Sequence, residues 1–455
     1  MKKNFFTSCL ILFSIIFVSC FEKNAQKHYT SATPKATLNL ALRSGIYSEV
    51  IKKCLKDFEK TYDIFCNVYE FSEADLHSSI LDGASYPEGP YDFCMVDGSW
   101  MAEFTSKNIL ANLSELGYSL DDDIIPATKT ICFYNDNVYL APYYGNVTVL
   151  LYNRIMVHEA GYKPEEINSL EDIFKICEFQ KNRHNLGFVF RGDTMNNIVV
   201  DFLPILRSRG AWVVDENNRP TVNTSEFSEA LYFYLDLIET GRAASKNDLI
   251  AAIANKSAAM GIGWPGWYTP TKNSSMDYIA LSGKFRNDRP SYNSNIYGIW
   301  AVGIPENSIN KEYAEKLLEY LMDKEVQKTT VSFGGVPCRY SSLNDTEILQ
   351  KFPQYNAVRE ALEGGIYRPV IENWTEFYTI LGQEMKAIID GKKEVFEGLY
   401  DAQRELEKSA IKTDYSKLAI IPSKYFLLSR YAPANAVSVY KATVLESISR
   451  SNLKS

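Results

Sequence analysis

Residues 36–71 contain three patterned segments in succession, ATLNLALR (36–43), EVIKKCLKDFEKTY (49–62) and IFCNVYEF (64–71). The two outer segments predict β-strands. The middle segment places its apolar side chains on one face, as an amphipathic helix does. A third strand, buried on both faces, is expected at 91–96. This alternation of strand and helix predicts an α/β fold with largely parallel sheets.

The alternation continues towards the carboxyl end of the chain. Residues 139–142 and 147–152 are expected to be extended and to meet at a turn. Ser169 is expected to cap a helix that ends near Gln180, because Asp172 follows three residues later as in a capping box. Further helices are predicted directly after Asn310, over 376–390 and over 394–410.

The amino terminus has the pattern of a secretory signal peptide. Lys2 and Lys3 precede an apolar run over 5–18. This run is shorter than the stretch of about 20 apolar residues that a permanent membrane-spanning helix needs. We therefore expect residues 1–19 to be a signal peptide and the protein to be exported, to the periplasm or the cell surface.

The residues at the end of this run read FVSC (17–20) and resemble the lipobox of bacterial lipoproteins. In that family the cysteine is acylated, with palmitate among the chains, and anchors the protein to the membrane. Phe17 departs from the aliphatic residue that the family prefers, so the alternative is an unmodified Cys20 in an ordinary signal peptide. We expect lipidation at Cys20 and a flexible tether over 20–35, because the residues that follow are polar and without periodicity.

Composition limits the classes of function. The roughly 435 residues beyond the signal peptide are too many for one hydrophobic core and predict two lobes. A net charge of −8 argues against a nucleic-acid surface and against a polybasic membrane patch. Of the eight cysteines, six follow Cys20, without a CxxC motif and without a histidine in ligand spacing. We expect neither a disulfide framework nor a metal site, and no cofactor.

Two further patterns bear on catalysis. The segment GIGWPG (261–266) satisfies the GxGxxG dinucleotide motif, but Pro265 and Pro270 bracket the expected helix start and Trp264 fills the turn. Nucleotide binding is therefore not expected. The sequence contains no GxSxG, P-loop or HExxH motif either.

Four stretches, taken together, carry a resemblance to a known family. They are YDFCMVDGSWMAEF (91–104), APYYGNVTVLLYN (141–153), AAMGIGWPGWY (258–268), and the segment from YGIWAVGIP (297–305) to GVP (335–337). Their order and spacing resemble the extracellular solute-binding proteins that serve bacterial carbohydrate ABC importers. The resemblance extends over roughly residues 38–412.

The resemblance implies a type II periplasmic-binding-protein fold, in which two α/β lobes, each with a mostly parallel sheet flanked by helices, enclose a ligand cleft at the hinge. The chain is expected to cross the hinge at 142–146, at 295–298 and near 341–345. The expected parts are an N-terminal lobe at 36–143 and 296–342, a C-terminal lobe at 144–295 and 343–413, and an extension at 414–455 packed on the second lobe.

Sugars present apolar C–H faces and a rim of hydroxyl groups, so their sites combine aromatic rings with carboxylate, amide and guanidinium groups. The resemblance places Asp97, Trp264, Trp300 and Arg368 at ligand-facing positions, and Asn146 stands where related sequences often carry aspartate. The full set of candidate ligand-binding residues is Asp97, Tyr143, Tyr144, Asn146, Trp264, Trp267, Trp300 and Arg368, with Arg43, Ser44 and Tyr47 as weaker contributors.

Each of these residues has a structural alternative. The tryptophans can be core residues, and the paired tyrosines can be hinge packing. Asp97 can cap the following helix, and Arg368 can pair with a surface carboxylate. The aspartate run at 121–123 is expected to be a solvated loop.

The leading functional hypothesis is a monomeric, non-catalytic receptor that closes on a mono- or oligosaccharide and presents it to an ABC permease. One alternative is a receptor of the same fold for another solute, such as a polyamine or a metal ion. Another is an exported glycosidase, which needs a second cleft carboxylate besides Asp97. A surface adhesin is the third.

Overall fold

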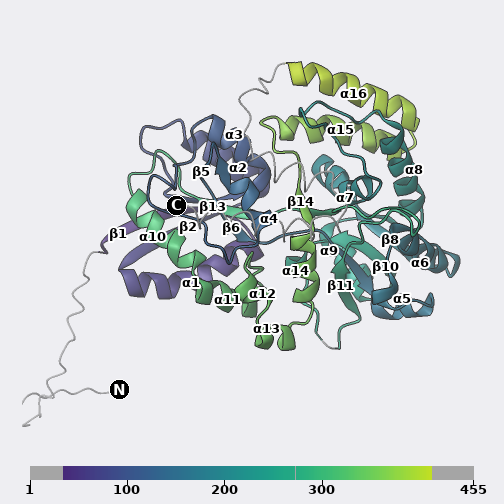
Figure 1. Ribbon diagram of the computed structural model, residues 1–455, viewed down its shortest axis with the longest axis horizontal. Helices are drawn as coiled ribbons and strands as arrows, with labels where there is room; N and C mark the ends of the chain where they lie inside the picture. The colour runs from purple at the N-terminus through teal and green to yellow at the C-terminus, as the bar shows by residue number, and fades with distance from the viewer. Residues whose placement is uncertain (1–33, 272, 412–455) are drawn as a thin grey trace, which may run out of the picture. The chain divides into compact units, whose positions relative to one another are not determined.

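The structure is a computed structural model that describes residues 34–271 and 273–411, and most of its strands form two five-stranded sheets (Figure 1). The first sheet takes its strands from 36–144 and 300–303, and the second takes them from 149–280. The expected signal peptide, Cys20 and the 414–455 extension lie outside the described residues. The two-lobed α/β fold predicted from the sequence is confirmed.

The first sheet has the strand order β2-β1-β3-β13-β6. Its strands are β1 (Ala36–Arg43), β2 (Ile64–Phe71), β3 (Phe93–Asp97), β6 (Ala141–Tyr144) and β13 (Trp300–Gly303). β1 pairs in parallel with β2 and β3, and Arg43 lies opposite Phe71 at the carboxyl ends of their strands. β13 runs antiparallel to both neighbours and places Trp300 opposite Asp97.

The second sheet has the order β11-β7-β10-β8-β9. Its strands are β7 (Val149–Asn153), β8 (Leu186–Arg191), β9 (Arg242–Ala244), β10 (Ala258–Gly263) and β11 (Met276–Ala280). β8 is parallel to β9 and β10, whereas β7 is antiparallel to β10 and β11. Each sheet is therefore mostly parallel, as predicted, with one reversed strand next to an edge strand. The reversed strand is in each case the first strand after the chain has passed from the other sheet.

The chain passes between the sheets after β6 and again between β11 and β13. On the return it forms β12 (Asn295–Tyr297), which pairs in parallel with β14 (Gly365–Tyr367). Thr148 donates its N–H to the carbonyl of Ile296 at 2.9 Å, so the two crossing segments are bonded to each other. The first two crossings expected from the sequence coincide with these segments. A separate hairpin pairs β4 (Phe133–Tyr134) with β5 (Asn137–Val138).

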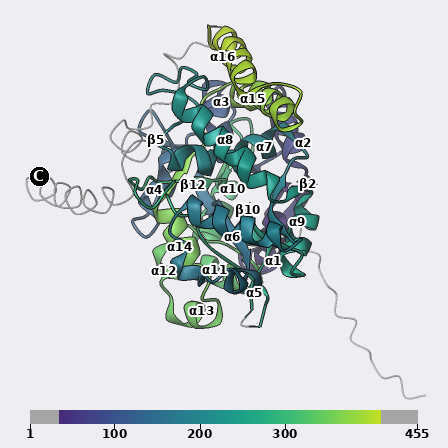
Figure 2. The same cartoon turned by 90° about the vertical axis from the view of Figure 1, so that its right-hand side faces the viewer.

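Helices cover both sheets. They are α1 (Ile46–Tyr62), α2 (Glu73–Gly83), α3 (Met101–Ser106), α4 (Pro126–Lys129), α5 (Arg154–Glu159), α6 (Leu170–Asn182), α7 (Met195–Ser208), α8 (Ser225–Glu239), α9 (Lys246–Ala254), α10 (Lys311–Met322), α11 (Lys324–Thr330), α12 (Tyr340–Leu343), α13 (Thr346–Lys351), α14 (Tyr355–Glu363), α15 (Trp374–Ile389) and α16 (Val395–Ile411). Figures 1 and 2 show α15 and α16 side by side, with α7 and α8 close to them. None of the described helices is long and apolar enough to cross a membrane.

Two hydrophobic clusters pack the helices against the sheets, and β7 contributes side chains to both clusters. Leu150 and Tyr152 belong to the cluster that includes the buried faces of α6, α7 and α8. Val149 and Leu151 belong to the cluster that also fills the first sheet. This division follows from the two-residue period of a strand, which sends successive side chains to opposite faces.

The N-cap predicted at Ser169 is confirmed, whereas the reciprocal backbone bond of the predicted capping box is made by the N–H of Asn168, which donates to the Asp172 carboxylate at 3.0 Å. Ser169 Oγ accepts the N–H of Asp172 at 3.2 Å and donates to its carboxylate at 2.9 Å. The resulting helix, α6, is 13 residues long and ends at Asn182, two residues beyond the predicted end.

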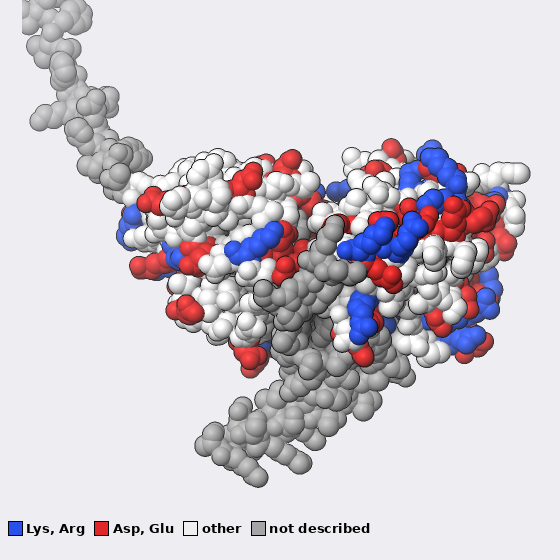
Figure 3. All heavy atoms as spheres, turned by 90° about the horizontal axis from the view of Figure 1, so that it is seen from above, with Lys and Arg blue, Asp and Glu red and all other residues white. Residues whose placement is uncertain are grey.

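The six described cysteines are buried free thiols. On the face drawn in Figure 3, lysine and arginine side chains of the described residues are interspersed with aspartate and glutamate. Ion pairs also link α15 to α16, where Lys393 contacts Glu384 at 2.6 Å and Asp401 at 2.8 Å. Such a mixed surface agrees with the expectation from net charge.

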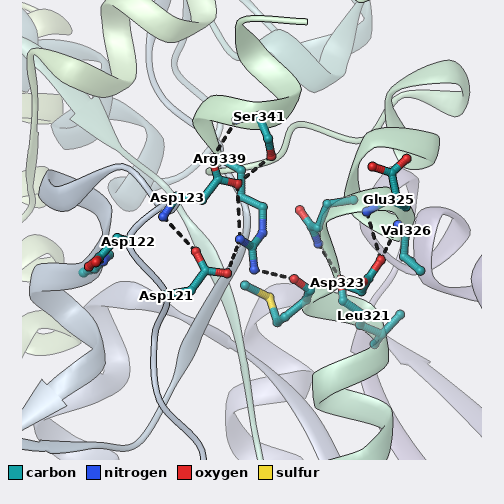
Figure 4. A network of polar contacts seen from close by, with 12 residues as sticks. Asp121, Asp122, Asp123, Leu321, Asp323, Glu325, Val326, Arg339 and Ser341 are labelled. Carbon is teal, nitrogen blue, oxygen red and sulfur yellow. Dashed lines mark hydrogen bonds and ion pairs between the residues drawn. The ribbon is translucent and has the colours of Figure 1, made fainter.

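The prediction of a solvated loop at 121–123 is wrong for two of its three aspartates (Figure 4). Arg339 is 3% exposed and donates through Nη1 to Asp121 at 2.5 Å and to Asp123 at 3.4 Å. Asp123 also accepts the backbone N–H of Ser341 at 2.9 Å. A buried guanidinium requires such acidic partners. Asp122 is fully exposed and points away from the network, as a solvated residue does.

Candidate ligand-binding site

Asp97 and Arg368, both expected in the site, form a buried ion pair. Asp97 is the last residue of β3, and Arg368 directly follows β14. The Arg368 guanidinium donates to Asp97 Oδ1, and the two side chains are 7% and 5% exposed. Ser99 donates to the same oxygen through its N–H at 2.9 Å and its hydroxyl at 2.7 Å. Asp97 therefore caps the short turn that follows it and also pairs with Arg368, whose expected alternative was a surface carboxylate.

An aromatic cluster adjoins this pair at the carboxyl ends of β1 and β3. The Trp300 ring centre lies 5.6 Å from that of Tyr47 and 5.5 Å from that of Trp100. Tyr144 meets Tyr47 edge-on at 4.9 Å. The guanidinium carbon of Arg43 lies 5.9 Å from the ring centres of both Tyr47 and Trp300. Ligand sites in α/β folds form at this edge of a sheet.

The loop after β1 brings the three weaker candidates together. Arg43 donates through Nη1 to Ser44 Oγ at 2.8 Å, so Ser44 helps to orient the guanidinium. Burial raises the pKa of the Tyr47 hydroxyl to about 12, and the positive charge of Arg43 opposes part of this increase. Tyr47 is therefore a neutral hydroxyl at physiological pH and is able both to donate and to accept.

The paired tyrosines of β6 separate onto opposite faces, as neighbours in a strand do. Tyr144 joins the aromatic cluster, and its hydroxyl donates to the carbonyl of Gly334 at 2.8 Å. Tyr143 is packed in the core of the first sheet, with its hydroxyl near the thiol of Cys54. Burial raises the pKa of both phenols well above the ordinary value. The structure therefore brings Tyr144, and not Tyr143, to the other candidate residues.

Asn146 and Trp264 line the crossing between the sheets. Asn146 Nδ2 donates to the Tyr47 hydroxyl at 3.2 Å, while its buried Oδ1 has no hydrogen-bond partner among the described residues. Trp264 packs on Gly298, where an added methyl group would lie 2.9 Å from the ring. The close approach of this ring to the second crossing thus requires glycine at 298.

Trp267 supports two basic side chains of the second lobe. The guanidinium carbon of Arg191 lies 5.1 Å from the Trp267 ring centre, and Lys246 Nζ lies 5.6 Å from it. Such contacts attract a cation to the ring face. Arg191 is 7% exposed and is paired with Asp201, to which Nε donates at 3.1 Å.

Glu73, at the start of α2, is a site residue that the sequence analysis missed. Asn196 Nδ2 of α7 donates to Glu73 Oε1 at 3.3 Å, which joins the two lobes directly. Burial and the negative charge of Asp97 raise the pKa of Glu73, while Arg368 and Arg43 act in the opposite direction. Glu73 comes two residues after β2. Ligand sites in α/β folds lie beyond the carboxyl ends of strands, so an examination of every strand end would have found Glu73. The same rule identifies Arg191 and Lys246.

A cavity of about 470 Å³ is lined by residues of α2, α3 and α15 and of the segment before α15. It is lined mainly by polar side chains, among them His77, Glu103, Asn373 and Glu376. His77 is 4.9 Å from Trp100 between ring centres, so the cavity adjoins the aromatic cluster. His77 Nε2 lies 2.7 Å from a Glu103 carboxylate oxygen. Among the described residues, no cluster of three or more acidic, histidine or cysteine side chains is able to hold a metal ion.

The assembled residues have the chemistry of a ligand-binding site. Tryptophan and tyrosine rings provide flat apolar surfaces, and buried carboxylate, amide and guanidinium groups provide directed hydrogen bonds. These groups come from both lobes, so a ligand between them contacts both at once.

Comparisons with known proteins agree on one family. The family model of bacterial extracellular solute-binding proteins matches residues 43–328. A probable amino-acid ABC transporter periplasmic-binding protein of Sinorhizobium fredii is 20% identical over 441 residues, which cover 92% of this chain and all of that protein. The arabinooligosaccharide-binding protein of Bacillus subtilis is 22% identical over 76% of this chain and 82% of its own.

Solved structures show the same fold. The maltose-bound MalE3 of T. maritima superposes with a TM-score of 0.71 at 22% identity, over 82% of this chain and 100% of that chain. A ribitol-bound ABC transporter solute-binding protein of Agrobacterium radiobacter K84 gives a TM-score of 0.73 at 20% identity, over 83% and 99% of the two chains.

Proposed function

Because the chain belongs to the family of bacterial extracellular solute-binding proteins, which are binding proteins of ABC transporters and not enzymes, we propose that its solute is a mono- or oligosaccharide. The protein holds the sugar between its two lobes and delivers it to the permease subunits of an ABC importer. For the two lobes we propose the division expected from the sequence, 36–143 with 296–342 and 144–295 with 343–413.

One observation carries this proposal. Trp300 and Tyr47 on the first lobe and Trp264 on the second are buried or half-buried beside the polar groups of Asp97, Arg368 and Asn146. Aromatic faces next to directed hydrogen-bonding groups match the two kinds of surface that a pyranose presents. The names of several relatives point the same way, since the Bacillus subtilis protein binds arabinooligosaccharide and the T. maritima structure holds maltose.

A side-chain contact between the two lobes agrees with a receptor whose lobes close around the ligand. The Asn196–Glu73 hydrogen bond at 3.3 Å links α7 to α2. Two-lobed receptors of this kind close around their ligand by hinge motion, and ligand contacts to both lobes stabilise the closed form.

A thermal-shift screen tests the proposal. We expect the full-length chain, purified in detergent, to be stabilised by a subset of a panel of mono- and oligosaccharides. A ligand at 100 times its dissociation constant stabilises the folded state by about 2.7 kcal/mol, which is measured as a rise in Tm. Amino acids, polyamines and divalent cations form the comparison set. A rise in Tm with one of these and with none of the sugars contradicts the proposed ligand class.

We also propose that Cys20 carries the lipid anchor that holds the protein at the membrane. We propose this because Cys20 lies directly after the apolar run. In a bacterial host the full-length chain is expected to partition into the detergent phase and to carry an acyl mass, whereas Cys20→Ser is expected to remain aqueous and unmodified. Cys54→Ser, which alters a buried thiol, serves as the matched control. Equal aqueous partition of the wild type and Cys20→Ser contradicts the anchor.

A further inference from the structure

Two basic side chains of the site lack an acidic partner. Of the four cations there, Arg368 is paired with Asp97 and Arg191 with Asp201. Among the described residues, no carboxylate oxygen lies within 4.0 Å of Arg43 or Lys246. The Arg43 contacts are to neutral oxygens, Ser44 Oγ at 2.8 Å and the carbonyls of Ser44 and Phe71.

Arg43 also keeps an unused donor. Its buried Nε has no hydrogen-bond partner among the described residues. A buried donor that is left unpaired costs free energy, so such a group in a binding cleft points to an acceptor that a ligand supplies. The acceptor that a guanidinium binds most strongly is an oxyanion.

Lys246 extends the same positive region from the other lobe. It is the first residue of α9, is exposed, and lies 5.6 Å from the ring centre of Trp267, which Arg191 also approaches. Although the residue as a whole is exposed, desolvation of its ammonium group and repulsion from Arg43 and Arg191 lower the pKa of Lys246. Arg191 and Lys246 both lie against the Trp267 ring, so an anion bound beside that ring relieves the repulsion between them.

On the basis of the proposed function, we propose that the ligand is a sugar that carries an oxyanion group, either a carboxylate or a phosphate. Arg43 and Lys246 bind this group beside Trp267. The acidic side chains of the site determine where the anion lies. Asp97 is paired with Arg368 and repels an anion there, so the sugar ring stacks in the aromatic cluster and its charged group points towards Lys246. The same arrangement disfavours cationic solutes.

Isothermal titration calorimetry on the full-length chain tests this proposal with matched sets of probes. Each set contains a neutral hexose, its uronic acid and its 6-phosphate, with the corresponding disaccharides where available. Charge-assisted hydrogen bonds contribute about 1.5–3 kcal/mol, so at least one charged member is expected to bind about tenfold or more tightly than its neutral parent. Preference for the uronic acid or for the phosphate identifies which oxyanion the site takes.

Lys246→Gln is expected to remove most of the preference for the charged member of each set, so that charged and neutral probes bind within about twofold of each other. Lys60→Gln removes the same charge from an exposed residue about 20 Å along α1 from the site and is expected to change neither value. Equal or tighter binding of the neutral sugars overturns the oxyanion assignment and leaves the proposed function standing. An unchanged preference in Lys246→Gln overturns the role of Lys246, and binding of no sugar at all overturns the proposed function itself.

Discussion

Replacing Arg368 by methionine is expected to shift the unliganded protein away from the closed arrangement and to weaken sugar binding by at least a hundredfold. The change leaves the Asp97 carboxylate buried with only its two hydrogen bonds from Ser99. Removal of one partner from a buried ion pair costs about 3–5 kcal/mol. We expect an opening of the cleft that lets water reach Asp97 to lower this cost, so the effect is measured as a loss of closure and of affinity.

Small-angle scattering and titration with the sugar found in the thermal-shift screen measure the two effects. The double variant Asp97→Asn, Arg368→Met removes both charges, and it is expected to bind more tightly than Arg368→Met alone. Lys393→Met, which breaks ion pairs on the α15–α16 surface, is the control for loss of a positive charge. A radius of gyration and an affinity equal to those of the wild type in Arg368→Met contradict the proposed role of the pair.

Local patterns in the sequence predicted a part of the strand–helix framework. The predicted strands 36–43 and 64–71 have the bounds of β1 and β2, because both combine β-branched or aromatic residues with clear breaks at their ends. The helix at Ser169 was predicted from its cap, which the structure confirms. The second-sheet strand β8 (Leu186–Arg191) was not predicted, since a short buried run carries no periodicity that separates it from a helix segment.

The polar contacts of the site were harder to predict, because they join residues far apart in the sequence. Asp97 and Arg368 were both identified as candidates, but their pairing across 271 positions leaves no local signal. The aspartates at 121 and 123 were assigned to solvent for the same reason, since their partner Arg339 follows more than 200 residues later. The family resemblance thus identified many of the site residues, whereas Glu73, Arg191 and Lys246 were missed, and tertiary structure determined which side chains are already paired.

Trp264→Ala and Trp300→Ala are expected to differ in a way that separates binding from folding. Trp300 is 3% exposed and belongs to the core cluster of the first sheet, so its truncation is expected to reduce the free energy of unfolding by about 3–5 kcal/mol as well as to weaken binding. Trp264 is 7% exposed but belongs to neither hydrophobic cluster of the described residues. Its burial comes from the crossing at Gly298, where the lobes meet.

Trp264→Ala is therefore expected to weaken binding of the sugar by roughly thirtyfold or more, as tryptophans at interfaces do, with a much smaller loss of unfolding free energy than Trp300→Ala. Trp212→Ala is the matched control, because Trp212 is 5% exposed within the core of the second lobe. It is expected to lower the unliganded Tm strongly and to leave the affinity of the folded protein unchanged. Titration calorimetry and thermal unfolding without ligand measure both quantities for each variant. If Trp264→Ala behaves like Trp212→Ala, losing stability at constant affinity, then its ring is a packing element and Trp267 is the tryptophan that the second lobe contributes to the site.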